Sequence, residues 1–455
     1  MVYDLIVLGG GPAGYLAAER AGHAGLNTLL VEKRYLGGVC LNEGCIPSKA
    51  LLYSAKVYDY AKHGEAYGVS CADVKFDHGK AIARKEKVVS ALVAGVKAAM
   101  KANKVTVIEG EGIISGRSAD GFKLTAEGNE YTGKNLLVAT GSVPIIPPIK
   151  GAKEAMDAGV VMTNREVLSL DHIPAELVIV GGGVIGLEMA SYYNSVGSHV
   201  TVIEMLDHIA GPTDKEISKI LLKNYTKKGV NFLLGCRVNE IGNDFVAYEK
   251  DGKVERVAAD KVLMSIGRRA QTSGIGLEAL GVELSRGAIV TDRYCKTNIA
   301  GVYAAGDVNG KSMLAHTAYR EAEVAVNNIL GKRDIMRYNA IPSVIYTTPE
   351  VGAVGETEES AKEKGIDYEC ANITMKYSGR YVAENETRDG ICKVLVDKKN
   401  RNVIGTHMIG SYASEIIFGA GIMIETQMRV EDIREIVFPH PTVCEILREA
   451  IFQID

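Results

Sequence analysis

Short apolar runs alternate with amphipathic stretches along this chain. Residues 2–8 are almost wholly apolar, which is typical of a central strand in a parallel sheet. A glycine-rich turn follows, then residues 15–21 predict a helix and residues 27–32 a second strand. The same order recurs at residues 176–180, 187–196 and 198–204. The pattern predicts an α/β fold containing two similar strand–turn–helix–strand units.

Glycines occupy the turn after the first strand of each unit. Both turns have the pattern GxGxxG: Gly9, Gly11 and Gly14, then Gly181, Gly183 and Gly186. The second strand ends on an acid, Glu32 or Glu204, in each case 23 residues after the first glycine. Such glycines let backbone amides approach a pyrophosphate, and the acid can accept hydrogen bonds from ribose hydroxyls. We therefore expect two dinucleotide sites. Since Glu204 would repel a 2′-phosphate, we expect NAD and not NADP at the second.

The rest of the chain supplies further elements. Residues 50–100 predict alanine- and lysine-rich helix, residues 136–142 a buried strand, and the prolines at 144, 147 and 148 a linker. Asp307 is the last residue of the strand predicted at 297–307. Ligands of α/β sheets bind at this carboxyl end of the strands. Beyond about residue 336, shorter β-rich runs alternate with charged helices, which predicts an α+β domain of the kind that often pairs subunits.

Composition limits the possible partners and locations. The 455 residues are 47% hydrophobic and carry a net charge of −4, so nothing suggests a nucleic-acid partner. No apolar run approaches the ~20 residues that a membrane crossing needs, and residues 2–8 lack the basic start of a signal peptide. Eight cysteines in so long a chain do not form a secreted disulfide framework. We expect a soluble cytoplasmic protein.

Cys40 and Cys45 are the first candidates for chemistry. They lie between glycines and ahead of Lys49, about one helical turn apart. The pair could close a small, easily opened catalytic disulfide, remain a reduced buried pair, or form half of a zinc site. Because no second pair with metal spacing is found elsewhere, we expect no metal site.

His440 and Glu445 are the second candidates. Pro441 is suited to begin a helix whose apolar face includes Val443 and Ile446. A carboxylate at Glu445 could hold the His440 imidazole in one tautomer and raise its basicity, which suits a base that takes a proton from a thiol.

Together these residues resemble the flavin-dependent pyridine nucleotide–disulfide oxidoreductases, and among them the members that oxidise dihydrolipoamide. The resemblance covers essentially the whole chain and is most specific at residues 37–49, the two glycine turns, and residues 139–141, 303–307, 313–316 and 440–445. It implies two Rossmann-like domains and a C-terminal α+β dimerisation domain. The implied boundaries are 1–145 for FAD with the redox disulfide, 146–268 for NAD, 269–335 for FAD again, and 336–455 for the interface.

The resemblance also implies roles for individual residues. FAD would be held by Gly9, Gly11, Gly14, Glu32, Lys49, Gly112, Thr140, Gly141, Asp307 and Ala315. NAD would be lined by Gly181, Gly183, Gly186, Glu188, Glu204, Val238 and Gly267. Lys49 and Glu188 would pair beside the flavin. Cys40 would exchange with substrate and Cys45 would contact the flavin. His440 and Glu445 would come from the second subunit of an obligatory homodimer.

The implied reaction is the oxidation of protein-bound dihydrolipoamide to lipoamide with reduction of NAD. The partner would be a lipoyl-bearing protein of a 2-oxo acid dehydrogenase or glycine cleavage complex. Two residues depart from the family pattern: Phe438 replaces a second histidine, and Glu43 replaces the usual valine between the cysteines. The chain also begins at the first nucleotide strand, without the lipoyl domain that some members carry.

Three alternatives remain. A glutathione-type reductase would prefer NADPH, which Glu204 disfavours. A mercuric-type reductase would end in a cysteine pair, which residues 452–455 lack. A flavoprotein with a mainly structural role in a multienzyme assembly is the third.

Overall fold

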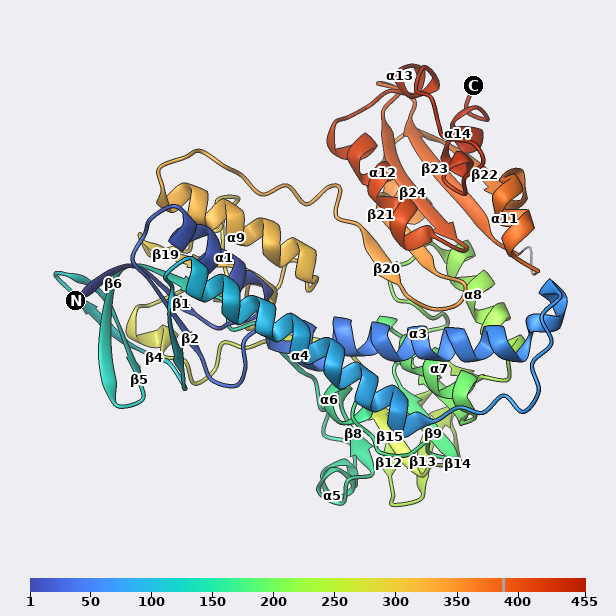
Figure 1. Ribbon diagram of the computed structural model, residues 1–455, viewed down its shortest axis with the longest axis horizontal. Coiled ribbons are helices and arrows are strands. Elements are labelled where there is room, and N and C mark those ends of the chain that lie inside the picture. Colours follow the sequence, from blue (N-terminus) through green and yellow to red (C-terminus); the bar gives the residue numbers. More distant parts are fainter. Residues whose placement is uncertain (387–388) are drawn as a thin grey trace. The chain divides into compact units, whose positions relative to one another are not determined.

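The computed structural model describes residues 1–386 and 389–455, and it divides the chain into two compact units (Figure 1). Unit 1 consists of Met1–Ala50, Ile82–Ile145 and Gly267–Arg337. Unit 2 consists of Leu51–Ala81, Ile146–Ile266 and Tyr338–Asp455. The four domain ranges expected from the sequence remain predictions.

Unit 1 is built on a mixed sheet with the strand order β3-β2-β1-β6-β5-β4, in which β19 also pairs with β6. Its strands are β1 (Val2–Leu8), β2 (Thr28–Glu32), β3 (Thr106–Glu109), β4 (Ile113–Ser118), β5 (Gly121–Ala126), β6 (Asn129–Val138) and β19 (Val302–Ala304). The pairs around β1 are parallel, and those joining β4, β5 and β6 are antiparallel. Leu5, Ile6 and Val7 of β1 are fully buried, which explains the unbroken apolar run.

Helices and short ribbons complete unit 1. The helices are α1 (Pro12–His23), α2 (Gly38–Glu43), the start of α3 (Cys45–Lys62), most of α4 (His78–Ala102), α9 (Ala315–Ile329) and the 3-10 turns η2 (Leu277–Ala279) and η3 (Asp307–Asn309). The ribbons are β7 (Ser142–Pro144) with β16 (Arg268–Ala270) and β17 (Leu284–Ser285) with β18 (Ala288–Ile289). Helices α1 and α9 pack side by side (Figure 1).

Unit 2 contains three sheets. The first is parallel, in the order β11 (Asn231–Leu234), β10 (His199–Glu204), β9 (Glu176–Val180), β15 (Lys261–Met264), β8 (Val161–Met162). The second is antiparallel: β12 (Arg237–Ile241), β13 (Phe245–Lys250), β14 (Lys253–Ala258). The third, also antiparallel, has the order β20 (Ser343–Ile345), β21 (Val351–Gly355), β24 (Val403–Ile409), β23 (Ile391–Asp397), β22 (Tyr368–Thr374).

The helices of unit 2 accompany these sheets. They are η1 (Gly64–Tyr67), α5 (Ala152–Asp157), α6 (Asn164–Val167), α7 (Val184–Val196), α8 (Lys215–Lys227), α10 (Glu358–Glu363), η4 (Met375–Tyr377), α11 (Gly379–Glu384), α12 (Ala413–Glu425), α13 (Val430–Arg434) and α14 (Glu445–Ile451). Helix α12 packs on β21 and β24, and α14 packs on β22 and β23 (Figure 1). Met408, Cys392 and Ala420 are fully buried in the core between these elements.

The predicted fold class is confirmed, with one mixed and one parallel sheet of the nucleotide-binding type and a C-terminal α+β domain. Two local predictions were wrong. Residues 50–100 do not form one helix: α3 ends at Lys62 and α4 begins at His78, and between them lie the 3-10 turn η1 and Gly68, whose φ is +76°. The last helix begins at Glu445 and not at Pro441, and Thr442 makes local hydrogen bonds with Pro439 and Glu445 ahead of it.

Among the described residues, no helix has both the length and the apolar character of a membrane crossing. A cytoplasmic location stays a prediction.

Candidate active site

The first glycine turn packs tightly on one side and is open on the other. Gly9 has a φ of +104°, and a Cβ there would collide with the Ala139 carbonyl oxygen. A Cβ on Gly14 would collide with the Gly9 carbonyl oxygen. At Gly11, by contrast, the nearest atom to a Cβ would be 3.9 Å away. The turn therefore closes onto the sheet while its outer backbone stays accessible to a phosphate group.

The start of α1 and the end of β2 complete this nucleotide cradle. Pro12 begins α1, and the N-cap residue is Gly11, which has no side chain to cap the amides of the first turn. The Glu32 carboxylate accepts from the Gly10 amide at 2.6 Å and from the Arg34 amide at 2.7 Å. Because a carboxylate has about four acceptor positions, Glu32 can still accept hydrogen bonds from ribose hydroxyls. The residues fit the adenosine diphosphate part of a dinucleotide.

The second turn, in unit 2, is built in the same way. Gly181 has a φ of +105°, and a Cβ there would lie 2.6 Å from the Ser265 carbonyl oxygen. Gly186 packs on the Gly181 carbonyl, and Gly183 has open space around its Cα. Glu204 accepts from the Gly182 amide at 2.7 Å and from the Leu206 amide at 2.8 Å. A second dinucleotide therefore fits this turn equally well.

The two candidate cysteines form a disulfide at a break between helices. Helix α2 ends at Glu43, Gly44 follows, and Cys45 begins α3, so the Cα atoms of Cys40 and Cys45 lie 4.7 Å apart. This pairing favours the redox interpretation over a reduced pair or half of a zinc site. No cluster of three or more His, Cys, Asp or Glu side chains suitable for a metal ion occurs within residues 1–386 and 389–455.

The disulfide segment lies directly on the first nucleotide turn. The Gly37 amide donates to the Gly10 carbonyl at 2.9 Å. A Cβ on Gly38 would lie 2.6 Å from the Gly11 Cα. A group bound on the turn would therefore run past the helix that carries Cys40.

A polar network in unit 1 joins Ser142, which follows β6, to Asp307, which follows β19. The Ser142 hydroxyl donates to the Asp307 carboxylate at 2.5 Å, and the Arg268 Nε donates to the Ser142 Oγ at 2.8 Å. Burial raises the pKa of Asp307, although the Ser142 hydrogen bond and the Arg268 charge oppose the rise. Sequence reasoning missed Ser142 and Arg268 as site residues; the signal available was that Ser142 follows Thr140-Gly141 and Arg268 follows Gly267.

The remaining predicted residues are distributed over both units. In unit 1, Thr140 donates to the Gln271 carbonyl at 2.7 Å, Gly141 and Gly267 have positive φ, and Ala315 begins α9. Gly112 packs where a Cβ would lie 2.6 Å from the Leu8 side chain, and Lys49 is the fifth residue of α3. In unit 2, Glu188 is buried in α7 and accepts from the Tyr346 amide at 3.1 Å, and Val238 is buried in β12 among core side chains.

His440 and Glu445 are in hydrogen-bond contact. The His440 Nδ1 and the Glu445 Oε1 lie 2.8 Å apart, and the Glu445 Oε2 accepts from the Thr442 amide at 2.9 Å. This amide lowers the pKa of Glu445, with burial opposing and His440 adding to the effect. With Nδ1 donating to a carboxylate, the Nε2 of His440 is left as the basic atom. The imidazole is 77% exposed, so it is accessible to a partner.

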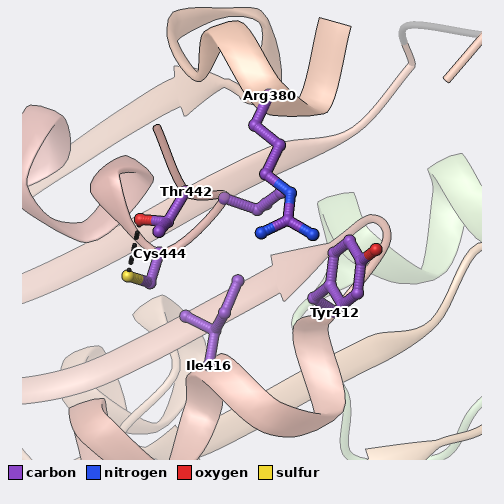
Figure 2. A pocket seen from close by; sticks show the side chains of 6 residues that line it. Arg380, Tyr412, Ile416, Thr442 and Cys444 are labelled. Atoms are coloured by element: carbon purple, nitrogen blue, oxygen red, sulfur yellow. Dashed lines mark hydrogen bonds between the residues drawn. The ribbon is translucent and has the colours of Figure 1, made fainter. Parts of the chain in front are cut away.

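A cavity of about 160 Å³ lies beside this loop (Figure 2). Arg380 reaches over the ring of Tyr412 at 5.4 Å, and the Thr442 hydroxyl lies 3.0 Å from the Cys444 sulfur. The cavity is lined by Arg380, Tyr412, Ile416, Thr442, Val443 and Cys444.

Comparison with known proteins adds two family matches. Residues 3–322 match the model described as pyridine nucleotide-disulphide oxidoreductase, and residues 341–451 match the dimerisation domain of that class. Dihydrolipoyl dehydrogenase of Mycoplasma pneumoniae is 39% identical over 99% of this chain and 98% of its own. Dihydrolipoamide dehydrogenase of Chaetomium thermophilum is 39% identical over 98% and 90%. Among solved structures, LpdA of Mycobacterium tuberculosis superposes with a TM-score of 0.91 at 27% identity over 99% of both chains.

Proposed function

The chain belongs to the pyridine nucleotide-disulphide oxidoreductase family, and from this premise we propose that it is a dihydrolipoyl dehydrogenase that uses FAD and NAD. The reaction is the oxidation of dihydrolipoamide to lipoamide with reduction of NAD⁺ to NADH and release of a proton. One observation carries the proposal: the Cys40–Cys45 disulfide lies on the first nucleotide turn, through the contacts of Gly37 and Gly38 with it.

The cysteine chemistry begins with a proton transfer. The Nε2 of His440 takes a proton from one substrate thiol, and Glu445 stabilises the resulting imidazolium. The substrate thiolate attacks Cys40, the Cys40–Cys45 bond breaks, and Cys45 leaves as a thiolate. The second substrate thiol then attacks the mixed disulfide, Cys40 leaves and takes up the proton of that thiol, and the lipoamide disulfide closes. Bound FAD would carry the two electrons from the cysteine pair to NAD.

The nucleotide sites are assigned by their acids. Glu32 would receive the ribose of FAD in unit 1, and Glu204 that of NAD in unit 2. Asp307, with Ser142 and Arg268, would contact FAD from the carboxyl ends of the strands. The pairing of Lys49 with Glu188 joins residues of different units and remains part of the proposal. The substrate would be carried by a lipoyl-bearing protein, and His440 would come from the partner subunit of a homodimer.

A cysteine substitution tests the function. Cys45→Ser should retain bound yellow flavin and lose dihydrolipoamide turnover by at least about 10³-fold, because no disulfide remains to be attacked. Turnover is followed by NADH absorbance, and flavin content by the visible spectrum of the purified protein. Cys71→Ser is the control, since Cys71 is exposed and is not part of a disulfide. Turnover retained by Cys45→Ser, or protein that binds no flavin, would contradict the proposal.

A further inference from the structure

Glu43 is a buried acid inside the redox segment. It is the last residue of α2, three positions after Cys40 and two before Cys45. Side chains three apart on a helix are neighbours, with Cβ atoms about 5–6 Å apart. The Glu43 side chain is only 6% exposed, so water screens its charge poorly.

Two side chains from the loop after β2 hold this carboxylate. The Tyr35 hydroxyl donates to the Glu43 Oε1, and the Arg34 Nη1 lies 3.5 Å from the same oxygen. Burial and this hydrogen bond raise the pKa of Tyr35 to about 12, so Tyr35 remains the donor. The backbone amide of Arg34 is itself bonded to Glu32, which ties the loop to the nucleotide cradle.

Two arginines interact with Glu43, so removing its carboxylate would leave their positive charges without this partner. The Arg34 side chain is 47% exposed, so its charge is screened by water more than that of the buried carboxylate. Arg268 also interacts electrostatically with Glu43, but its Nε is hydrogen-bonded to Ser142 and it shares its charge with Asp307. Glu43 is the one charged residue of α2, the helix that carries Cys40.

We propose that Glu43 lowers the reduction potential of the Cys40–Cys45 disulfide through the negative charge of its side chain, three residues from Cys40 and two from Cys45. The inference rests on the proposed function, since it requires the disulfide to cycle. Reduction by a dithiol breaks the Cys40–Cys45 bond and transfers two electrons and two protons, while the dithiol closes its own disulfide. When one cysteine remains as thiolate, its proton resides on a base. A nearby carboxylate repels that thiolate and so favours the oxidised pair.

The test measures the thiol–disulfide equilibrium of the holoenzyme. The protein is equilibrated without oxygen in mixtures of reduced and oxidised dithiothreitol, quenched with acid, and its free Cys40 and Cys45 are counted by alkylation and mass spectrometry. Glu43→Gln should shift the equilibrium toward the reduced pair about tenfold, which is about 30 mV for a two-electron couple. Glu43→Asp keeps the charge and should stay within about twofold of wild type. Arg34→Gln should shift the equilibrium the other way.

Matched outcomes separate charge from packing. Glu65→Gln changes the net charge equally at an exposed site of unit 2 and should have no effect. An unchanged potential in Glu43→Gln would overturn the proposal. So would an Asp variant displaced as far as the Gln variant, since shortening the side chain would then matter more than its charge. If dithiothreitol does not reduce the wild-type pair at all, the proposed function fails and this inference fails with it.

Discussion

Glu445 combines two tasks in one side chain. One oxygen faces the His440 Nδ1 at 2.8 Å, and the other accepts from the Thr442 amide at 2.9 Å. The amide fixes the carboxylate and lowers its pKa, so the group stays ionised at a pH where an ordinary glutamate begins to protonate. An ionised, immobile carboxylate keeps the proton of the imidazole on Nδ1 and leaves Nε2 free to act.

The Glu445→Gln variant should expose this role. An amide cannot stabilise an imidazolium as a carboxylate does, so dihydrolipoamide turnover should fall by about 10²-fold. NADH-dependent reduction of an artificial dye bypasses the thiol step and should be unchanged. Both activities are measured on the same preparation, with Glu449→Gln of the same helix as the control. Equal loss of both activities would indicate structural damage instead of a role in proton transfer.

At the level of elements, a buried ion cluster joins helix α8 to the antiparallel sheet of unit 2 that contains β23. Asp214 caps α8 with one oxygen, which accepts from the Glu216 and Ile217 amides. Its other oxygen lies 2.8 Å from the Lys393 Nζ on β23, which also lies 2.5 Å from Glu358. Burial is the largest single influence and disfavours both charges, but the surrounding hydrogen bonds and charges together outweigh it: the pKa of Asp214 is lowered and that of Lys393 is raised.

Removing one partner of this cluster should destabilise the fold. Lys393→Met leaves Asp214 buried without its cation and should lower the free energy of unfolding by about 3–5 kcal/mol. Urea unfolding of the holoenzyme measures the loss, and exposed Lys398→Met is the control.

The pH dependence of this stability follows from the two pKa shifts. The lowered pKa of Asp214 contributes stability above its unfolded value of about 3.9, and this is lost as the pH falls through the folded value. The raised pKa of Lys393 contributes below about 10.4, and this is lost as the pH rises through the folded value. The difference between wild type and Lys393→Met should therefore be largest between these limits and shrink outside them. A difference that does not change with pH would argue against the ion pair as its source.

At the level of the molecule, the groups of the proposed reaction belong to different units. The disulfide is in unit 1 and His440 is in unit 2, within the matched dimerisation domain. That domain supports a homodimer, and α12 exposes Phe418 and Ile422, four residues apart, to 68% and 45%. In a two-fold dimer, each proposed site would combine the cysteines of one chain with His440 of the other.

Complementation between two inactive variants tests this arrangement. Cys45→Ser and His440→Gln dimers should each lack dihydrolipoamide turnover. After the two are mixed, dissociated and reassociated, half of the dimers are mixed, and one of the two sites in each has intact cysteines and an intact histidine. Activity should therefore recover to about one quarter of the wild-type value. If the histidine acted on the cysteines of its own chain, mixing would restore no activity.

The sequence by itself determined the nucleotide turns, the strands that flank them and the spacing of the cysteines. These features are local, because glycine φ angles, apolar runs and helical spacing act over a few residues. The two turns that begin at Gly9 and Gly181 were predicted for this reason. Their backbone is open at Gly11 and Gly183, as expected.

Only the tertiary structure decided which distant groups meet. Ser142 contacts Asp307 across 165 residues, and Lys393 contacts Asp214 across 179. Nothing near these residues in the sequence specifies such a contact, since it depends on how the strands and helices pack. The start of α14 at Glu445 was likewise not given by the apolar pattern that follows Pro441. Long-range packing, not local preference, assembled these polar networks.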